Sequence, residues 1–249
     1  MSARKLPSRV SLLDARNDPQ GAYFAGSMWI PLNELEARLH ELPPPYADLE
    51  VPDSQSETLA FLKGTGRQAI VVSVEPQLSK PPLTRLWHEN PLLKHILKGG
   101  RALDLGCGSG RDAIALSGLG YTVQAIDWLP SALQKARELE WRTYGDNLID
   151  WREMDLRKEA PEGQFDVITM FSFHKADLIK TAIERLNPDG RILVEMFTPE
   201  HQAAMGKPKN VVTEQELREA LGQLECLGLD SGWRGDRHTV RGVWAKKSA

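Results

Sequence analysis

The sequence is poor in cysteine and has no long apolar run, and each absence excludes a class of protein. Its 249 residues include two cysteines, Cys107 and Cys226, with no CxxC pair and no Cys/His cluster at zinc spacing. A disulfide framework and a structural zinc site are therefore excluded, and we expect free thiols in a reducing compartment. No apolar stretch approaches the roughly 20 residues that a membrane-spanning helix needs. The N-terminal stretch MSARKLPSRV also lacks the apolar segment of a secretory signal, so we expect a cytoplasmic protein with no membrane partner.

An excess of positive charge is also missing. The formal net charge is −3 and the sequence pI is about 6.1, so no global basic field is present to hold a phosphate backbone. The composition therefore argues against a nucleic-acid partner. Apolar residues make up 41% and charged residues 26%, which is ordinary for a folded globular protein.

A proline pair divides the chain into two segments. Pro81 and Pro82 cannot continue a helix or a central strand, which places a domain boundary near residue 80 and predicts units at 1–80 and 81–249. The first segment predicts a β-α-α-β order, with strands at 10–14 and 69–74 and a helix that ends after residue 62. Leucines at three- and four-residue steps predict one further helix face, at Leu32, Leu35, Leu39 and Leu42.

The second segment alternates strands and helices. Strands are expected at 102–105, 122–126, 149–154, 165–170, 191–196, 227–230 and 238–244. Helices are expected at 92–97, 111–119, from 131 onward, at 178–186 and at 214–221. This alternation predicts an α/β fold with a seven-stranded, Rossmann-like sheet whose last two strands form an antiparallel hairpin. Ligands of such sheets bind at the carboxyl ends of the strands.

A glycine-rich loop follows the strand at 102–105 and opens the next helix, reading Leu103-Asp-Leu-Gly-Cys-Gly-Ser-Gly-Arg-Asp112. Glycines let the backbone turn tightly and approach a ligand closely, because no Cβ intervenes. N–H groups of the following helix can then meet a polar ligand. A dinucleotide-binding loop would have its third glycine at position 111, where Arg111 stands, and Asp104 would repel a pyrophosphate but suits a ligand with an amino group. An NAD-dependent oxidoreductase is therefore disfavoured.

The loop resembles the D-x-G-x-G-x-G motif of class I S-adenosylmethionine-dependent methyltransferases, here Asp104, Gly106, Gly108 and Gly110, with Cys107 inside it. In that family the loop wraps the methionine part of S-adenosylmethionine. The resemblance covers residues 84–249 and implies a methyltransferase that uses this cofactor. The compact layout is similar to the tellurite-resistance and thiopurine methyltransferase-like group, which acts on small, soft nucleophiles.

Three further strand ends match the family. The resemblance implies that Asp127, after the second strand, binds the ribose hydroxyls and that Trp128 lies against the adenine. It implies that Asp155, after the third strand, accepts from the adenine amino group, with Leu156 beside it. Phe171, after the fourth strand, is expected near the cofactor. Either acidic residue alone is better explained as a strand-end cap, so the ordered set carries the prediction.

The sequence assigns neither a catalytic residue nor a methyl acceptor. Transfer from a sulfonium mainly requires in-line positioning, and a general base is needed only when the nucleophile must lose a proton. The stretch after the fourth strand lacks the Asn-Pro-Pro-Tyr pattern of enzymes that methylate amino groups of nucleic-acid bases. His174 there is a candidate base or substrate contact, although a surface histidine is the favoured interpretation. Further candidate walls of the acceptor site are 197–202, Arg234, Arg237, His238 and Arg241.

The first segment resembles a rhodanese domain over residues 9–75. The matching stretches are Val10–Arg16, with its Asp-x-Arg ending, Tyr23–Gly26 and Ile30–Leu35. A sulfurtransferase needs a cysteine nucleophile in a loop of N–H groups, and no cysteine precedes residue 75. Residues 43–57 stand where the catalytic strand and loop would be. We therefore expect a shortened, inactive rhodanese-like module that docks on the second segment, covers its pocket or binds a protein partner, or else a generic α/β extension.

Taken together, the sequence predicts an S-adenosylmethionine-dependent methyltransferase acting on a small molecule with a soft sulfur, selenium or tellurium nucleophile. Two alternatives stay open. One is a non-catalytic cofactor sensor or scaffold, in which the first segment recruits a partner. The other is a methyltransferase acting on protein or RNA.

Overall fold

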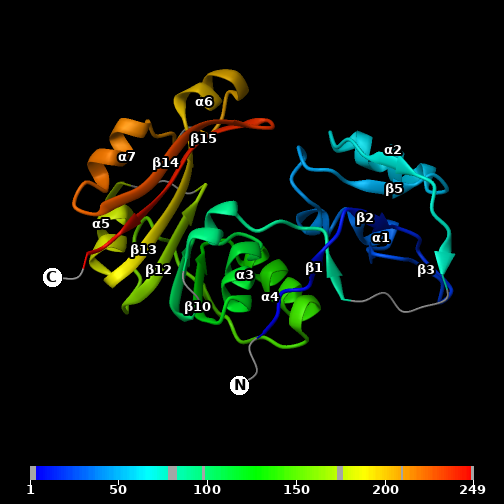
Figure 1. The fold of residues 1–249 in the computed structure, drawn as a ribbon, viewed down its shortest axis with the longest axis horizontal. Helices are drawn as coiled ribbons and strands as arrows, with labels where there is room; N and C mark the ends of the chain where they lie inside the picture. Colours follow the sequence, from blue (N-terminus) through cyan, green and yellow to red (C-terminus); the bar gives the residue numbers. More distant parts are fainter. Residues whose placement is uncertain (1–3, 78–82, 97–98, 173–175, 209, 248–249) are drawn as a thin grey trace. The chain divides into compact units, whose positions relative to one another are not determined.

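The chain folds into two compact units (Figure 1). The computed structural model describes residues 4–77, 83–96, 99–172, 176–208 and 210–247. One unit is Pro7–His88, and the other holds the chain from Glu89 onward together with the residues up to Leu6. The predicted boundary near residue 80 lies outside the described residues. Within those residues, every helix is too short or too polar to cross a membrane.

The smaller unit is built on a four-stranded parallel sheet. Its strands are β2 (Leu12–Asp14), β4 (Ser27–Trp29), β5 (Glu50–Pro52) and β6 (Ile70–Val72), in the order β4-β2-β5-β6. Two short pairs accompany it: β1 (Ser8–Arg9) with β8 (Thr84–Arg85), and β3 (Tyr23–Phe24) with β7 (Pro76–Gln77). The helices are α1 (Leu32–Leu35), the 3-10 turn η1 (Leu39–Glu41) and α2 (Ser56–Gly64).

The predicted helix face at 32–42 is real, but the helix is not continuous. All four leucines pack into the core of the smaller unit, while the helix is interrupted between α1 and η1. Arg38, in the break, donates to Glu41 from two nitrogens, at 2.8 and 2.9 Å. Three prolines follow at 43–45 and end the segment, because proline cannot donate to a helix. Periodicity therefore predicted which side chains are buried and not how far the helix runs.

The larger unit contains a seven-stranded sheet in the order β11-β10-β9-β12-β13-β15-β14. Its strands are β9 (Gly100–Leu105), β10 (Tyr121–Asp127), β11 (Asp150–Glu153), β12 (Phe165–Phe171), β13 (Leu186–Phe197), β14 (Glu225–Arg234) and β15 (Arg237–Ala245). β9 to β13 pair in parallel, and the β14–β15 hairpin joins β13 through antiparallel β15. The predicted seven-stranded sheet with a terminal hairpin is confirmed.

Helices cover both faces of this sheet (Figure 1). α3 (Arg111–Gly118) and α4 (Pro130–Tyr144) pack together on one face, and α5 (Ala176–Glu184) and α7 (Glu214–Ala220) on the other. The connections from β9 through β11 run toward one edge, and β12 then lies on the other side of β9. The carboxyl ends of β9 and β12 therefore form the switch point where such sheets bind ligands.

Two local predictions differ from the structure, and one helix was not predicted. The helix expected at 92–97 is the 3-10 turn η2 (Pro91–His95), with Leu97 outside the described residues. β13 begins at Leu186 rather than 191, and it passes through the expected turn at 187–190 with an irregularity in its pairing to β12. α6 (Pro199–Met205) was not predicted, although Thr198-Pro199 carries a proline in the first helical turn, a recognised start signal.

Candidate functional site

The glycine loop between β9 and α3 is fixed by backbone hydrogen bonds. The N–H groups of Gly106 and Cys107 both donate to the carbonyl of Ile126 at 2.9 Å, which ties the loop to β10. Gly110 has φ +81°, and a Cβ there would lie 2.4 Å from the Trp151 ring and 2.8 Å from Ala136 Cβ. Glycine at this position is thus required by backbone conformation and by packing. The loop opens α3, as the motif predicted.

Asp104 is a buried carboxyl group with one oxygen left over. Its Oδ1 accepts a 2.7 Å hydrogen bond from the Thr169 hydroxyl on β12. The Ala113 N–H also interacts with the carboxyl group, but Oδ2 makes no hydrogen bond of good geometry among the described residues. Burial, reinforced by the nearby carboxylates of Asp112 and Asp127, raises the pKa of Asp104 to about 7. A buried acceptor without a partner is costly unless a ligand satisfies it. This orphaned oxygen beside the glycine loop suits a cationic amino group.

Asp127 ends β10 and holds the loop from the other side. Its carboxylate accepts from the N–H of Gly108 and the N–H of Leu129, each at 2.9 Å. A carboxylate has about four acceptor positions, so two remain for ligand hydroxyls. Asp104 and Asp127 also interact electrostatically, which places both near the loop. The structure thus brings together the loop and the first two acidic residues of the predicted site.

Trp128 and Asp155, both predicted at the adenine, are connected by an arginine that the sequence analysis did not single out. Arg157 donates to both oxygens of Asp155, at 2.7 and 3.0 Å, and its guanidinium lies 5.0 Å from the centre of the Trp128 ring. This pairing holds the pKa of Asp155 well below its usual range. The Trp128 side chain is half exposed. Arg157 follows Asp155 by two residues, a spacing that could have identified it.

The remaining predicted residues differ in exposure. Leu156 is buried in the main apolar core of the larger unit, whereas Phe171 is only partly buried at the end of β12. Burial raises the pKa of the Cys107 thiol, with the carboxylates of Asp104 and Asp127 adding to the effect, so it is not a thiolate at neutral pH. His174 lies outside the described residues.

A partly buried polar network beyond the motif links the start of α3 to β13 and β15. Asp112, in the first turn of α3, accepts from the N–H of Asn90 at 2.6 Å, and burial raises its pKa to about 6. The Asn90 amide donates to Glu195 on β13 at 2.5 Å, and Glu195 also accepts from the Thr239 hydroxyl at 2.9 Å. Asp112 lies two residues after Gly110, the last glycine of the motif, and a charged residue there was the available signal. Glu195 and Thr239, which come from distant strands, have no comparable signal in the sequence.

The candidate acceptor walls form an aromatic cluster at the carboxyl end of β13. The Phe197 and His201 rings stack at 4.5 Å, and the His238 ring meets Trp233 edge-on at 5.2 Å. Nδ1 of His238 lies 2.7 Å from the Thr198 hydroxyl, and its backbone N–H donates to Nδ1 of His201 at 3.3 Å. Burial lowers the pKa of His201, which favours the neutral ring. The predicted wall at 197–202 therefore lies beside His238 of the hairpin. Arg234 and Arg241, which were also predicted walls, line a pocket with Leu92 and Lys94 instead.

Comparison with known proteins identifies the larger unit. Residues 80–234 match a family described as a methyltransferase domain. Ribosomal protein L11 methyltransferase of Ralstonia pickettii (strain 12J) is 32% identical over 134 residues, 51% of this chain and 43% of that protein. Thiocyanate methyltransferase 1 of Arabidopsis thaliana is 30% identical over 149 residues, 53% of this chain and 64% of that protein. The chain thus spans less than two thirds of the length of these curated relatives.

Solved structures share the fold. TehB from Haemophilus influenzae aligns with a TM-score of 0.54 and 23% identity, over 62% of this chain and 60% of TehB. The N-methyltransferase NodS from Bradyrhizobium japonicum WM9, in complex with S-adenosyl-L-homocysteine, aligns with a TM-score of 0.51 and 17% identity, over 63% of this chain and 82% of NodS. The matched domain covers more than half of the chain, and its glycine loop lies at the switch point of the sheet. The chain belongs to the S-adenosylmethionine-dependent methyltransferases.

Proposed function

We propose that this protein transfers the methyl group of S-adenosylmethionine to a small molecule with a soft nucleophilic atom, such as sulfur. The observation that carries the cofactor assignment is the unsatisfied Oδ2 of Asp104, buried beside the glycine loop. An α-ammonium group would give this oxygen a donor and offset the electrostatic cost of the buried carboxylate.

The chain's own residues bind and orient the cofactor in this proposal. Bound S-adenosylmethionine supplies an electrophilic methyl group on a sulfonium. The carboxylate of Asp104 accepts from the α-ammonium, and the free acceptor positions of Asp127 take the ribose hydroxyls. Trp128 lies against the adenine and Asp155 accepts from its amino group. Since Arg157 now contacts both of these side chains, it must shift when the base binds.

The acceptor class is supported by one relative's name and by chemistry. Thiocyanate methyltransferase 1 is among the similar proteins, and thiocyanate is an anion with a soft sulfur nucleophile. Such a group is ionised at neutral pH, so transfer requires orientation rather than a general base. A protein acceptor is the second candidate, because another relative is named as a ribosomal protein methyltransferase. The two candidate acceptors are distinguished by whether the protein methylates a small anion that is supplied without any protein substrate.

Calorimetric titration tests the cofactor assignment. S-adenosylmethionine and S-adenosylhomocysteine are titrated into the wild type, Asp104→Asn and the control Asp150→Asn, with NAD in parallel. Asp150 is an exposed carboxylate on β11, so its loss should leave binding unchanged. We expect both sulfur cofactors to bind and Asp104→Asn to weaken them by about tenfold or more, from loss of a charge-assisted hydrogen bond. Absence of binding to the wild type would favour a non-catalytic scaffold.

Acceptor preference is tested by formation of S-adenosylhomocysteine. Thiocyanate, a small aliphatic thiol and total ribosomal protein are supplied separately with S-adenosylmethionine. Turnover with either small nucleophile and none with protein supports the proposal. Turnover confined to ribosomal protein would replace it by the second candidate.

We also infer that Pro7–His88 is a shortened rhodanese-like module without sulfurtransferase activity, which binds a protein partner. Support comes from its parallel sheet and from the Asp-x-Arg ending of the first strand of that sheet, where Arg16 donates to both oxygens of buried Asp14 at 2.9 and 2.6 Å. β5 lies within residues 43–57, the stretch that stands in place of the family's catalytic strand and loop. An assay of sulfur transfer from thiosulfate to cyanide should show no turnover, and measurable turnover would refute this assignment.

A further inference from the structure

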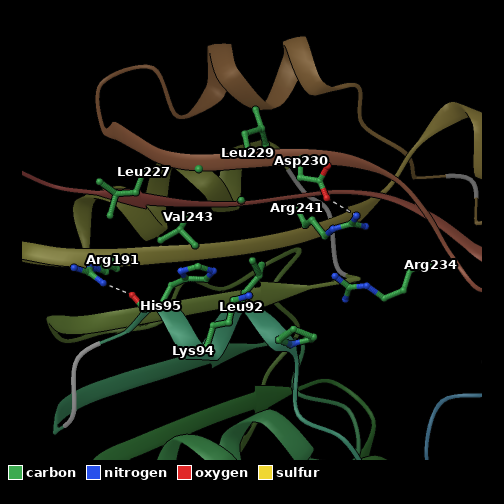
Figure 2. Close-up of a pocket in the computed structure, with 13 residues that line it drawn as sticks. Leu92, Lys94, His95, Arg191, Leu227, Leu229, Asp230, Arg234, Arg241 and Val243 are labelled. Carbon is green, nitrogen blue, oxygen red and sulfur yellow. Dashed lines mark hydrogen bonds and ion pairs between the residues drawn. The ribbon is translucent and has the colours of Figure 1, made fainter. Parts of the chain in front are cut away.

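A pocket of about 420 Å³ lies between η2 and the outer hairpin of the sheet (Figure 2). η2 supplies one wall, through Leu92 and Lys94, and the β14–β15 hairpin supplies the opposite wall. Arg191, from the middle of β13, closes one end, and Arg234, from the end of β14, stands at the other. The volume is within the range of pockets that hold small organic ligands. None of the predicted cofactor-binding residues lines this pocket.

The charged lining of this pocket is mostly basic. The lining contains one carboxylate, Asp230, and four basic side chains. The basic side chains are those of Lys94, Arg191, Arg234 and Arg241. The carboxylate is already committed, because Asp230 accepts from Arg241 at 2.5 Å. The protein as a whole has a net charge of −3, so this concentration of positive charge is local. A cavity with such a lining attracts anions.

The basic groups divide into two that are held in place and two that have donors to offer. Arg241 also donates to the Thr239 hydroxyl and the Gly232 carbonyl, and Arg191 donates to the carbonyl of His95. Arg234 has Glu195 as an ion-pair partner at 3.7 Å, longer than a hydrogen bond. Lys94 has no carboxylate within ion-pair distance among the residues described. The Lys94 and Arg234 side chains are therefore the groups most able to bind an added anion.

Apart from His95, the remaining side chains that line the pocket are apolar. Leu92 from η2, and Leu227 and Val243 from the hairpin, contribute to it. Leu227 is nearly half exposed, so a ligand ring seated against it would remove apolar surface from water. An inorganic anion would leave this surface uncovered. The combination of basic and apolar groups suits a molecule that has both an anionic group and an aromatic or aliphatic body.

We propose that this pocket is a second small-molecule site, which binds an organic anion with an apolar ring body, separately from the cofactor. The anionic group pairs with Lys94 and Arg234, and the ring body packs against Leu92 and Leu227. Arg234 and Arg241 were predicted as walls of the acceptor site, and here they line a pocket that contains none of the predicted cofactor-binding residues. Anion binding at this pocket does not depend on methyl transfer, because it needs neither the cofactor nor the cofactor motif.

Two fluorescent probes with the same rings test the proposal. 8-Anilinonaphthalene-1-sulfonate carries an anionic group, and N-phenyl-1-naphthylamine lacks it. Each is titrated into the full-length protein with and without saturating S-adenosylhomocysteine. We expect the sulfonate to bind with one-to-one stoichiometry, about tenfold more tightly than the neutral probe, and to weaken as salt is raised. Retention of binding in the presence of S-adenosylhomocysteine separates this site from the cofactor site, and the probe result stands even if that cofactor does not bind.

Matched variants locate the bound probe. Lys94→Gln and Arg234→Gln should each weaken binding of the sulfonate probe by about threefold or more, and should leave the affinity for the neutral probe unchanged. Lys135→Gln on α4 and Arg218→Gln on α7 remove exposed cations elsewhere and should have no effect. Circular dichroism and thermal unfolding verify that each variant is folded. Equal affinity for the two probes, an unchanged Lys94→Gln/Arg234→Gln double variant, or displacement of the sulfonate by S-adenosylhomocysteine would overturn the proposal.

Discussion

At the scale of single residues, two carboxyl groups near the glycine loop, buried Asp104 and partly buried Asp112, oppose folding as they ionise. The pKa of Asp104 is raised to about 7 and that of Asp112 to about 6, and burial is the main cause of both. An unfolded aspartate titrates near pH ~3.9. At pH values between the unfolded and the folded pKa of each aspartate, the folded protein binds more protons than the unfolded chain. Its stability therefore falls as the pH rises toward 7.

Asp104→Asn is therefore expected to stabilise the cofactor-free protein at pH 8. An asparagine keeps an acceptor for the Thr169 hydroxyl and carries no charge to desolvate. The gain should be on the order of 1 to 4 kcal/mol at pH 8 and should shrink toward pH 4.5, where the wild-type carboxyl is protonated. Urea unfolding at pH 4.5, 6 and 8 measures it, with Asp150→Asn as the control. Parallel pH profiles for the wild type and Asp104→Asn would contradict the prediction.

Gly110→Ala is expected to destabilise the protein more than Gly145→Ala. Both glycines have positive φ, +81° and +76°, so both substitutions carry the backbone strain of about 1 to 2 kcal/mol. A Cβ at Gly145 meets nothing within 4 Å, whereas one at Gly110 collides with Trp151 and Ala136. Overpacking should add about 1 to 3 kcal/mol at Gly110. Thermal unfolding of the two variants gives this difference directly, and equal losses would show that the loop relaxes around the new methyl group.

The sequence predicted the site only where the contributing residues are near in the chain or end a strand. The glycine loop with Asp104 and Asp127 follows from local spacing, because strand ends of a parallel sheet share one edge. Thr169, which binds Asp104, comes from a strand 65 residues away in sequence. The same holds for Glu195 and Asn90. A hydrogen bond between such residues depends on register and packing, which a local pattern does not contain.

At the scale of elements, α4 is anchored to the β11 end of the sheet by one buried carboxylate. Glu140 accepts from the backbone N–H groups of Leu148 and Ile149 at 2.8 and 3.1 Å, and from Nε1 of Trp151 at 2.8 Å. Arg4 donates to it as well, at 2.8 Å. These donors come from the loop after α4, from β11 and from the N-terminal segment. A single side chain thus fixes where the chain enters β11.

Glu140→Gln should destabilise the larger unit by about 3 kcal/mol, because an amide NH₂ would face donors and Arg4 would lose its buried counter-charge. Glu138→Gln, on the exposed side of the same helix, is the control and should change stability by less than about 0.5 kcal/mol. Unfolding in urea, followed by circular dichroism, measures both. A loss at Glu140 no larger than that at Glu138 would mean that water replaces the missing contacts.

Element type was more predictable than element extent. The strands of the seven-stranded sheet were all located, because apolar runs that end in polar residues are strong local signals. η2 was expected to be a longer helix, since its leucines have helical spacing. It lies between the capping Asn90, which is followed by Pro91, and the glycines at 99 and 100, and these residues limit its length. β13 extends through an expected turn because Leu186, which follows α5 closely, already pairs with Phe165 of β12. Tertiary pairing decided these limits.

At the scale of the whole molecule, two compact units should unfold as two transitions, of which one responds to cofactor. S-adenosylhomocysteine at about 100 times its Kd stabilises the state that binds it by about 2.7 kcal/mol. Only the unit from Glu89 onward carries the glycine loop. Differential scanning calorimetry should therefore show one transition moving upward with the ligand while the other stays fixed. A shift of both transitions together would show that the units unfold as one.

The position of Arg4 has a consequence for how the polypeptide is assembled during synthesis. Arg4 belongs to the unit formed by Glu89 onward, and its partner Glu140 lies 136 residues later in the sequence. On a ribosome that adds about 5 to 20 residues each second, this segment waits several seconds for its partner to emerge. All of Pro7–His88 has been synthesised by then, and it forms an insertion within a unit whose two sequence segments have not yet met.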